Sequence, residues 1–223
     1  MIGILSLVIP QIVSAQENFQ SELSLGVNGG VSMSSVSFNP RIPQSKLRQG
    51  VGGLSARYIS EKHFGIQCEL NYSQRGWKEM YPDSVNRHYS RSLAYLELPV
   101  LTHIYFETGK RGRIVFNLGP QIGYFLSQKE LEPNNIDKNK DKTPNYVMKI
   151  QNRFDWGLCF GGGFEFRTDI GNFVLDGRYY FGLSDIFDNS KIVKDPETVA
   201  FNFASSSNQV ICVKLTYLFK LKN

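Results

Sequence analysis

The chain lacks the residue pairs from which most metal sites and disulfide frameworks are built. Its 223 residues contain three cysteines, Cys68, Cys159 and Cys212, and no CxxC motif. An odd number of widely spaced cysteines indicates neither a zinc site nor a set of disulfides. Each cysteine lies in a segment with strand-like alternation, where the usual role is that of a small, half-buried side chain. We therefore expect no metal and no cofactor.

The chain also lacks a strong charge of one sign and, beyond its first residues, a long apolar run. The net charge of +5 is spread along the sequence, and no cluster of Lys and Arg alternates with aromatic residues, so a nucleic-acid partner is not expected. After residue 16 no segment approaches the about 20 consecutive apolar residues of a membrane-spanning helix. What is abundant is aromatic residues and glycine, with 16 Phe, 11 Tyr and 20 Gly, a composition that favours strands and tight turns.

The first residues, MIGILSLVIPQIVSAQ, predict a secretory signal peptide. An apolar core from Ile2 to Val13 is followed by the small-residue sequence Val13-Ser14-Ala15, so we expect residues 1–15 to be removed by cleavage after Ala15. No Lys or Arg precedes the apolar core, which leaves the true translation start open. The mature chain, residues 16–223, is expected to be exported and to form one domain.

Eight segments after residue 21 alternate between apolar and polar residues with a period of two, which predicts strands. Most are longer than the about 5–6 residues of a typical soluble strand. They have the length that a tilted strand needs to cross a bilayer and project beyond it. The candidate strands cover residues 22–34, 47–59, 64–77, 92–106, 113–126, 152–166, 172–183 and 207–221.

The connections between these segments alternate strictly between short and long. The short ones are residues 60–63, 107–112 and 167–171, and the long polar ones are residues 35–46, 78–91, 127–151 and 184–206. This alternation is typical of an outer-membrane barrel, which has short periplasmic turns and long extracellular loops. We predict an all-β fold, an eight-stranded antiparallel transmembrane up-and-down β-barrel with four long extracellular loops and both termini in the periplasm.

The polar row of the strands carries charges that we expect to face a narrow lumen. If this barrel were soluble and its charges faced the lumen, the large apolar row of every strand would face water. The exposed apolar area would then far exceed the few hundred Å² that soluble monomers tolerate. About eight strands leave a lumen that side chains fill, so the inward charges should pair as a structural plug. A catalytic or conducting cluster is the alternative. The predicted interior charges are Arg57, Glu69, Arg75, Glu97, Glu165, Asp176, Arg178 and Lys214.

Glycines and prolines inside the strands lead to two local predictions. Gly157, Gly161 and Gly163 lie on the inward row, and we expect them to leave room for long side chains from the opposite wall. Pro99 and Pro120 lie within consecutive strands. Because proline removes a ladder donor, we predict a bulge at each.

The last strand, VICVKLTYLFKLKN, is expected to close the barrel against the first. It resembles the signal that the barrel-assembly machinery reads, in which a polar residue is followed by glycine and then by hydrophobic residues. Here these roles fall on Lys214, Tyr217, Phe219 and Leu221, with Thr216 where the glycine belongs. The match is therefore partial.

Patterns that could form an enzyme or metal site find little support. Residues 137–144, DKNKDKTP, echo a calcium-binding loop but lack its glycine and its terminal acid. An enzyme acting at the barrel rim would need a histidine and a serine there, and His88 with Ser84, Ser90 or Ser92 is the available group. Such residues are common in polar loops, so we expect no enzyme and keep a lipid-modifying rim enzyme as an alternative.

Several segments resemble the PorT-type outer-membrane β-barrel family of Bacteroidetes, whose architecture is similar to that of OmpX and the OmpA barrel domain. The resemblance covers nearly the whole chain from about residue 22. It implies an outer-membrane barrel whose two strand prolines are family features, and it does not specify a function. The segments are YLELPVL (95–101), NLGPQIGYFLS (117–127), GGGFEF (161–166), LDGRYYFGLSDI (175–186) and LTYLF (215–219).

The function expected from these observations is that of an integral outer-membrane protein that acts through its loops or its periplasmic face. The resemblance implies, as an alternative, a component of type IX secretion and gliding. A small passive porin is a further alternative. The expected partners are outer-membrane lipid and lipopolysaccharide, the barrel-assembly machinery during insertion, and an unidentified secretion-system or extracellular protein.

Overall fold

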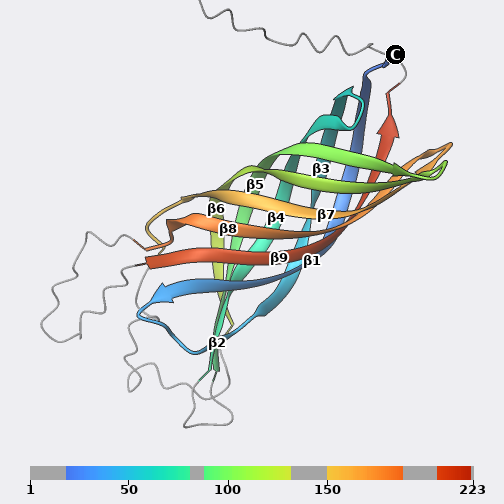
Figure 1. Ribbon diagram of the computed structural model, residues 1–223. Coiled ribbons are helices and arrows are strands. Elements are labelled where there is room, and N and C mark those ends of the chain that lie inside the picture. Colours follow the sequence, from blue (N-terminus) through green and yellow to red (C-terminus); the bar gives the residue numbers. More distant parts are fainter. Residues whose placement is uncertain (1–18, 81–87, 132–149, 188–204, 222–223) are drawn as a thin grey trace, which may run out of the picture.

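The structure, a computed structural model, describes residues 19–80, 88–131, 150–187 and 205–221 (Figure 1). The predicted signal peptide lies outside the described residues. In the described part the chain forms strands and no helix, so it contains no helix long and apolar enough to cross a membrane. The strands are β1 (Glu22–Asn39), β2 (Gln44–Ser45), β3 (Leu47–Glu61), β4 (Phe64–Met80), β5 (His88–Thr108), β6 (Gly112–Leu131), β7 (Phe154–Thr168), β8 (Gly171–Asp185) and β9 (Ser205–Lys220).

Eight of the strands close into one ring. The order is β4-β3-β1-β9-β8-β7-β6-β5, and β5 pairs back with β4. Every pair in the ring is antiparallel, and the last strand, β9, pairs with the first, β1. The two-residue strand β2 pairs only with β4 and lies outside the ring. The predicted eight-stranded up-and-down barrel is confirmed.

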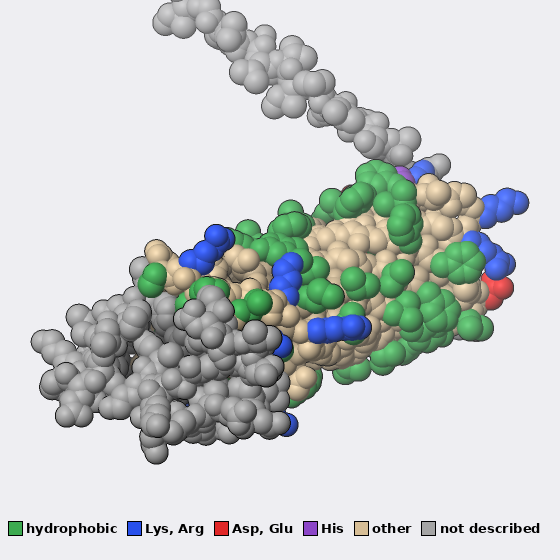
Figure 2. Space-filling model, turned by 90° about the horizontal axis from the view of Figure 1, so that it is seen from below, with side chains coloured by type: hydrophobic (Ala, Val, Ile, Leu, Met, Phe, Trp, Pro, Cys, Tyr) green, Lys and Arg blue, Asp and Glu red, His purple; other side chains and the backbone are tan. Residues whose placement is uncertain are grey.

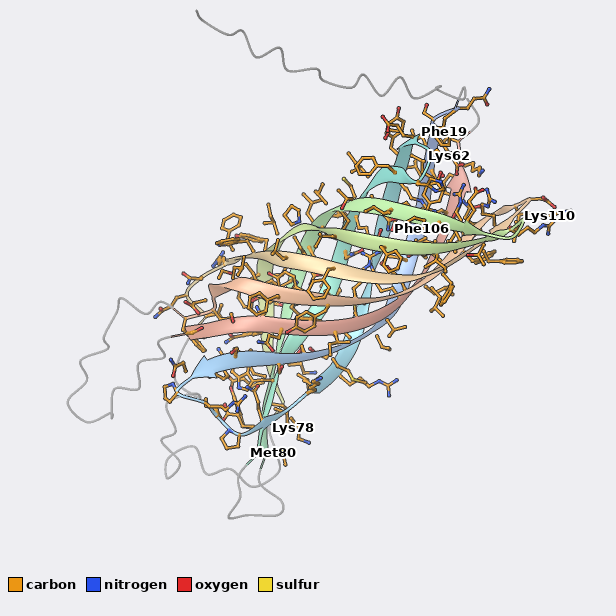
Figure 3. All side chains as sticks on the ribbon, in the orientation of Figure 1. Phe19, Lys62, Lys78, Met80, Phe106 and Lys110 are labelled. Carbon is orange, nitrogen blue, oxygen red and sulfur yellow. The ribbon has the colours of Figure 1, made fainter. Side chains whose placement is uncertain are left out.

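The two ends of the barrel differ in their connections. At one end, here called the terminal end, β1 begins, β9 ends and the strands are joined by turns of two or three residues. The other end, here called the loop end, holds all the longer connections. Figure 3 places Lys62 and Lys110 at the terminal end and Lys78 and Met80 at the loop end.

The strands reach further toward the loop end than predicted. β1 continues to Asn39, β4 to Met80, and β5 already begins at His88. The predicted long connections 35–46 and 78–91 therefore include strand residues. The prediction ended β1 too early because, in its added residues, the inward side chains are apolar and the outward ones polar, the reverse of the pattern in the rest of the strand.

An apolar band surrounds the outside of the barrel. On β1 the outward row runs from Leu23 to Met33, which is about 33 Å along a strand and about 25 Å in height at a usual tilt. Aromatic side chains mark both edges of the band, for example Tyr58 and Phe106 toward the terminal end and Tyr72 toward the loop end. This is the height and edging that a transmembrane barrel shows.

Above the band, toward the loop end, the two faces of the strands exchange polarity. The outward side chains of β1 become Ser35, Ser37 and Asn39, and its inward side chains become Val36 and Phe38. The loop end is thus built like a soluble barrel, with an apolar inside and a polar outside.

The predicted bulges at the two strand prolines are wrong. Pro99 pairs with Gln121 and the register is unchanged on the far side, where Thr102 pairs with Leu118. Two pairs are missing from the ladder between them, so the lost donor interrupts pairing without an inserted residue. The bulge of this strand pair lies nearer the loop end, where β6 carries the extra residue Leu126.

Candidate functional site

All eight predicted interior charges point into the lumen, and none is more than 6% exposed. The structure adds four buried charges, Glu79, Arg91, Arg113 and Asp155. Among the described residues the buried charged side chains are therefore six acids and six bases, apart from His103. A balanced interior is what a closed lumen requires, since an unpaired buried charge is costly.

The first ion cluster lies toward the terminal end. Arg57 makes two contacts with Glu165, at 2.8 and 3.2 Å, and its Nη1 also donates to His103 Nε2 at 3.0 Å. Because a guanidinium can only donate, His103 carries its proton on Nδ1 and donates it to Asn117 Oδ1 at 2.9 Å. Arg113 adds a second cation 3.6 Å from Glu165. The forked Arg57–Glu165 pair joins opposite walls of the barrel.

The second cluster lies in the middle of the barrel and centres on Glu69. Lys214 pairs with one carboxylate oxygen of Glu69, and Arg178 Nη2 lies 2.9 Å from the other. Asn71 Nδ2 also donates to Glu69, at 2.9 Å, and Arg178 pairs with Asp176 on its own strand. The four charges sum to zero, so this layer needs no ion from outside.

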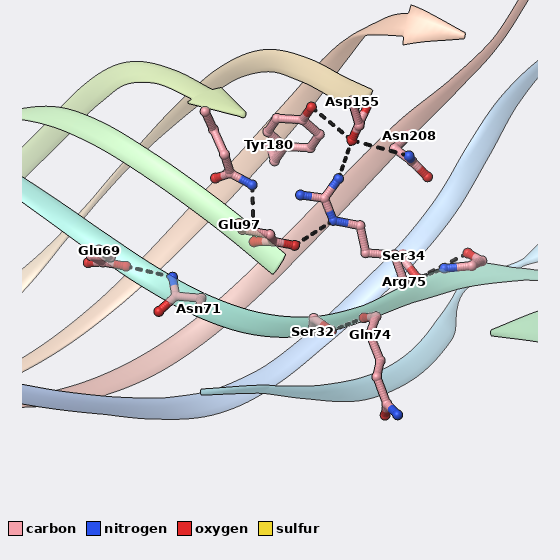
Figure 4. A network of polar contacts seen from close by, with 12 residues as sticks. Ser32, Ser34, Glu69, Asn71, Gln74, Arg75, Glu97, Asp155, Tyr180 and Asn208 are labelled. Carbon is pink, nitrogen blue, oxygen red and sulfur yellow. Dashed lines mark hydrogen bonds and ion pairs between the residues drawn. The ribbon is translucent and has the colours of Figure 1, made fainter. Parts of the chain in front are cut away.

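The third cluster lies toward the loop end and is shown in Figure 4. Arg75 Nε donates to Glu97 at 2.7 Å, and Arg75 also pairs with Asp155. The guanidinium lies between two tyrosine rings, 4.3 Å from the centroid of Tyr180 and 5.0 Å from that of Tyr95. Tyr180 in turn donates its hydroxyl to Asp155 at 3.0 Å. The cation is therefore held by charge, hydrogen bonds and ring faces together.

Apolar side chains close the lumen on both sides of the three clusters. The terminal cap consists of Ile59, Tyr105, Val115, Val174 and Leu218. The loop cap consists of Val36, Phe38, Trp77, Tyr89, Leu93, Tyr95, Ile186 and Phe187. In the loop cap, the ring of Trp77 lies edge-on to Phe38 at 5.4 Å and to Phe187 at 6.4 Å.

The space left between the caps is small. A cavity of about 20 Å³ lies between the middle and loop-side clusters, lined among others by Arg75, Glu97, Arg178 and Lys214. A volume of this size holds about one water molecule. The lumen is therefore filled by side chains and is not an open channel.

The inward glycines of β7 make room for charged side chains, but not for those of the opposite wall. A Cβ at Gly161 would lie 2.8 Å from Arg178 Cγ, and one at Gly163 would lie 2.8 Å from Asp176 Cβ. Both Arg178 and Asp176 belong to β8, the neighbouring strand. The prediction that these glycines leave room for long side chains is therefore confirmed. The prediction that those side chains come from the opposite wall is wrong, because the side chains nearest to an inward position are those of the strand paired with it.

Where β3 separates from β4, a serine of β1 makes hydrogen bonds to the backbone of β4. The β3–β4 ladder ends at Val51 and Ser73, although β4 continues to Met80. The Ser34 hydroxyl donates to the Gly76 carbonyl at 3.0 Å and accepts the Gly76 N–H at 2.8 Å. These bonds satisfy backbone groups that the departing strand leaves unpaired.

The closing strand places its predicted assembly residues on both faces. Lys214 points into the lumen, Tyr217 donates its hydroxyl to the Ile170 carbonyl at 2.7 Å, and Phe219 and Leu221 lie on the outside near the terminal end. The role of these residues in assembly stays a prediction.

The residues weighed for a rim enzyme are only partly described. Ser84, the side chain of His88 and the segment 137–144 lie outside the described residues, and Ser90 and Ser92 are buried serines of β5. No group of three or more His, Cys, Asp or Glu that could hold a metal occurs in the described part of the chain.

Sequence reasoning missed four interior charges for identifiable reasons. Glu79 and Arg91 fall in a predicted connection, 78–91, whose two ends belong to the strands β4 and β5. Arg113 and Asp155 lie on the same inward rows as Asn117 and Gly157. Both residues lie inside the predicted strands 113–126 and 152–166, so the alternation alone would have identified both.

Comparison with known proteins relates this barrel to a family model and to solved structures. A family model described as outer membrane protein beta-barrel domain matches residues 14–188. The solved structure of OprG from Pseudomonas aeruginosa is 12% identical, with a TM-score of 0.54 over 90% of this chain and 96% of that one. Ail of Yersinia pestis is 15% identical, with a TM-score of 0.45 over 89% and 99% of the two chains. The likeness to OprG supports the fold alone, and a comparison with curated proteins found no match.

Proposed function

The chain belongs to the outer membrane protein β-barrel domain family, whose model matches residues 14–188 of its 223, and on this premise we propose that it is a sealed membrane anchor. In this role the barrel conducts no solute and holds its loop end rigidly outside the cell. The observation that carries the proposal is the pair of apolar caps around three paired ion clusters.

The filled lumen supports a sealed barrel over a passive porin. A porin needs a continuous aqueous path, and that path would have to pass both caps. In the loop cap Trp77 and Leu93 are 0% exposed, and in the terminal cap Val115 and Leu218 are also 0% exposed. Between the caps the ion pairs satisfy one another, so a permeating ion would have to break them.

The connections support an orientation with the loop end outside. Outer-membrane barrels have short periplasmic turns and longer extracellular loops, and here all three turns of two or three residues are at the terminal end. Both termini would then lie in the periplasm. The barrel would protrude from the membrane at the loop end, where the outside is polar and the inside apolar.

We propose a binding or structural role for this protein, without enzymatic activity. Within the three clusters every acid is paired with a base, and the cavity left beside them holds about one water molecule, so a substrate would not fit among them. A rim enzyme built on His88 stays an alternative, and replacement of His88 by alanine with an assay of acyl transfer tests it.

The proposed partners follow the expectations drawn from the sequence. They are outer-membrane lipid and lipopolysaccharide around the barrel, the assembly machinery during insertion through the Lys214–Leu221 strand, and a protein outside the cell or in a secretion system. The PorT-like role in type IX secretion and gliding remains an alternative. Co-isolation with secretion components from outer membranes would support it over a general anchor.

Conductance in planar bilayers tests the sealed lumen. We expect no stable openings from the native protein, nor from the control variant Trp156→Ala, whose ring lies on the lipid-facing outside. A double variant that shortens one residue of each cap, Trp77→Ala with Tyr105→Ala, should raise the frequency of brief openings. Stable openings of the native protein would overturn the proposal.

A further inference from the structure

The described residues at the loop end carry an excess of positive charge on their outer surface. Among the described residues six basic side chains lie on this outer surface, here called the basic belt, and five of the six are exposed while Lys78 is half-buried. Figure 2 shows Lys and Arg side chains near the loop end on the face in view, with no acidic side chain among them. The basic belt consists of Arg41, Lys46, Arg48, Lys78, Lys129 and Arg153.

The acidic side chains of the same end do not neutralise the belt. In the described part of the loop end these are Glu79, Glu130 and Asp185, and none of the three is exposed. Glu79 accepts the indole N–H of Trp77 at 2.9 Å inside the lumen, and Asp185 accepts the backbone N–H of Ser206 at 2.5 Å. No ion pair joins a belt residue to an acid within the described residues.

The terminal end shows a different distribution of charge. Its bases and acids are mixed, and several of them pair. Lys220 lies 2.9 Å from Glu22, Arg167 3.5 Å from Glu107, and Arg111 3.7 Å from Asp169. Within the described part of the chain, the excess of positive charge is therefore specific to the loop end.

The belt begins directly above the apolar band. Arg153 precedes the outward Phe154, and its Nη1 lies 3.5 Å from the hydroxyl of Tyr124 at the edge of the band. Lys78 pairs with Ser45 of β2, next to Lys46. A molecule that lies along this wall would meet apolar side chains over one part of its length and cations immediately beyond.

An apolar surface followed by cations is complementary to an amphiphile whose acyl chains lie in the membrane and whose anionic groups lie at the boundary with water. We propose that the basic belt binds the phosphate groups of an acylated, phosphorylated glycolipid in the outer leaflet. The bulge at Leu126 contributes to this surface, because it shifts the alternation of β6 so that Gln128 faces the buried Arg91, at 2.5 Å, and Lys129 faces outward. The inference rests on the proposed orientation with the loop end outside.

Binding of lipid A to the folded, full-length protein in detergent micelles tests the inference. The probe is bisphosphorylated lipid A, and the same lipid without phosphates is the comparison. The test variant is Lys46→Gln, Arg48→Gln, Lys78→Gln and Lys129→Gln together. The matched control removes the same number of charges at the terminal end, through Lys62→Gln, Lys110→Gln, Arg111→Gln and Lys220→Gln.

We expect the native protein and the control variant to bind bisphosphorylated lipid A equally. The test variant should bind it more than about tenfold more weakly, because a base near anionic headgroups contributes about a fivefold factor, and the effect should shrink with added salt. The lipid without phosphates should bind weakly to all three proteins.

Two results would overturn the inference. One is an equal loss in the test and control variants, which would mean that net charge alone matters. The other is tighter binding of a soluble sulfated oligosaccharide than of lipid A, which would assign the belt to a polyanion from solution. Binding in micelles depends on neither conductance nor orientation, so a failure here differs from a failure of the sealed anchor.

Discussion

The middle of the barrel and its loop end are made by the same strands and have opposite polarity. In the middle of β5 the inward side chains are Glu97 and His103 and the outward ones are Leu96 and Leu98. At the loop end of the same strand, the inward row holds Leu93 and Tyr89 beside Arg91, and the outward row holds the small polar residues Ser90 and Ser92. The backbone pairing continues through both regions.

The difference shows that the surroundings determine which face of a strand is apolar. Where lipid surrounds the barrel, the apolar row faces outward and charges must pair inside. Where water surrounds it, burial of apolar surface can again stabilise the interior. The two regions should therefore respond differently to the loss of a charge, of an aromatic ring and of an outward apolar residue.

The largest effect is expected where a buried cation of the middle region is removed. Arg75→Met would leave Glu97 and Asp155 buried without their partner. We expect the free energy of unfolding to fall by about 3–5 kcal/mol, measured by denaturant unfolding in lipid vesicles. Arg48→Met, which removes an exposed base, should change it by less than about 0.5 kcal/mol. Equal effects would contradict a lumen held by ion pairs.

An effect of similar or slightly smaller size is expected from the loop cap. Trp77→Ala removes a fully buried ring that packs against Phe38 and Phe187, and such losses cost about 3–5 kcal/mol. The same unfolding experiment measures it. Trp156→Ala is the matched control, because this ring faces lipid and leaves no internal cavity. If the control cost as much, the loop end would not be an apolar core.

The position of the membrane predicts that the cost in stability of an outward charge on β1 depends on where along the strand it is placed. Val27→Arg places a charge on the outward row in the middle of the band and should cost about 2–4 kcal/mol, whereas Ser37→Arg at the loop end should cost at most about 1 kcal/mol. Val27 is 54% exposed on the outside of the protein, so packing cannot explain the difference. Similar costs at both positions would place Ser37 in lipid.

The smallest predicted effect concerns the serines where β3 leaves β4. Ser34→Ala leaves the Gly76 N–H without its acceptor at 2.8 Å, and a buried unsatisfied donor costs about 1–3 kcal/mol. Ser35→Ala, on the outward face of the same strand, serves as the control and should be near neutral. A neutral Ser34→Ala would show that another group or water satisfies Gly76.

Period-two alternation was sufficient to predict the eight strands of the ring and the inward face of residues such as Glu69 and Lys214, but it did not predict the two-residue strand β2. It failed at the loop end, where Val36 and Phe38 face inward, because the environment outside the barrel changes while the period does not. It also could not predict partners across the lumen. Arg57 and Glu165 are 108 residues apart, and their meeting depends on strand tilt and register, which alternation does not encode.

The most direct test of the exchanged polarity is a spin-label scan of the outward row of β1. Single cysteines at Val27, Val31, Met33, Ser35 and Ser37, in a chain without its own three cysteines, would carry the label in lipid vesicles. We predict that collisions with oxygen dominate at Val27 and Val31, and collisions with a water-soluble nickel chelate at Ser37, with the change between Met33 and Ser35. Oxygen dominance that continues to Ser37 would contradict the account.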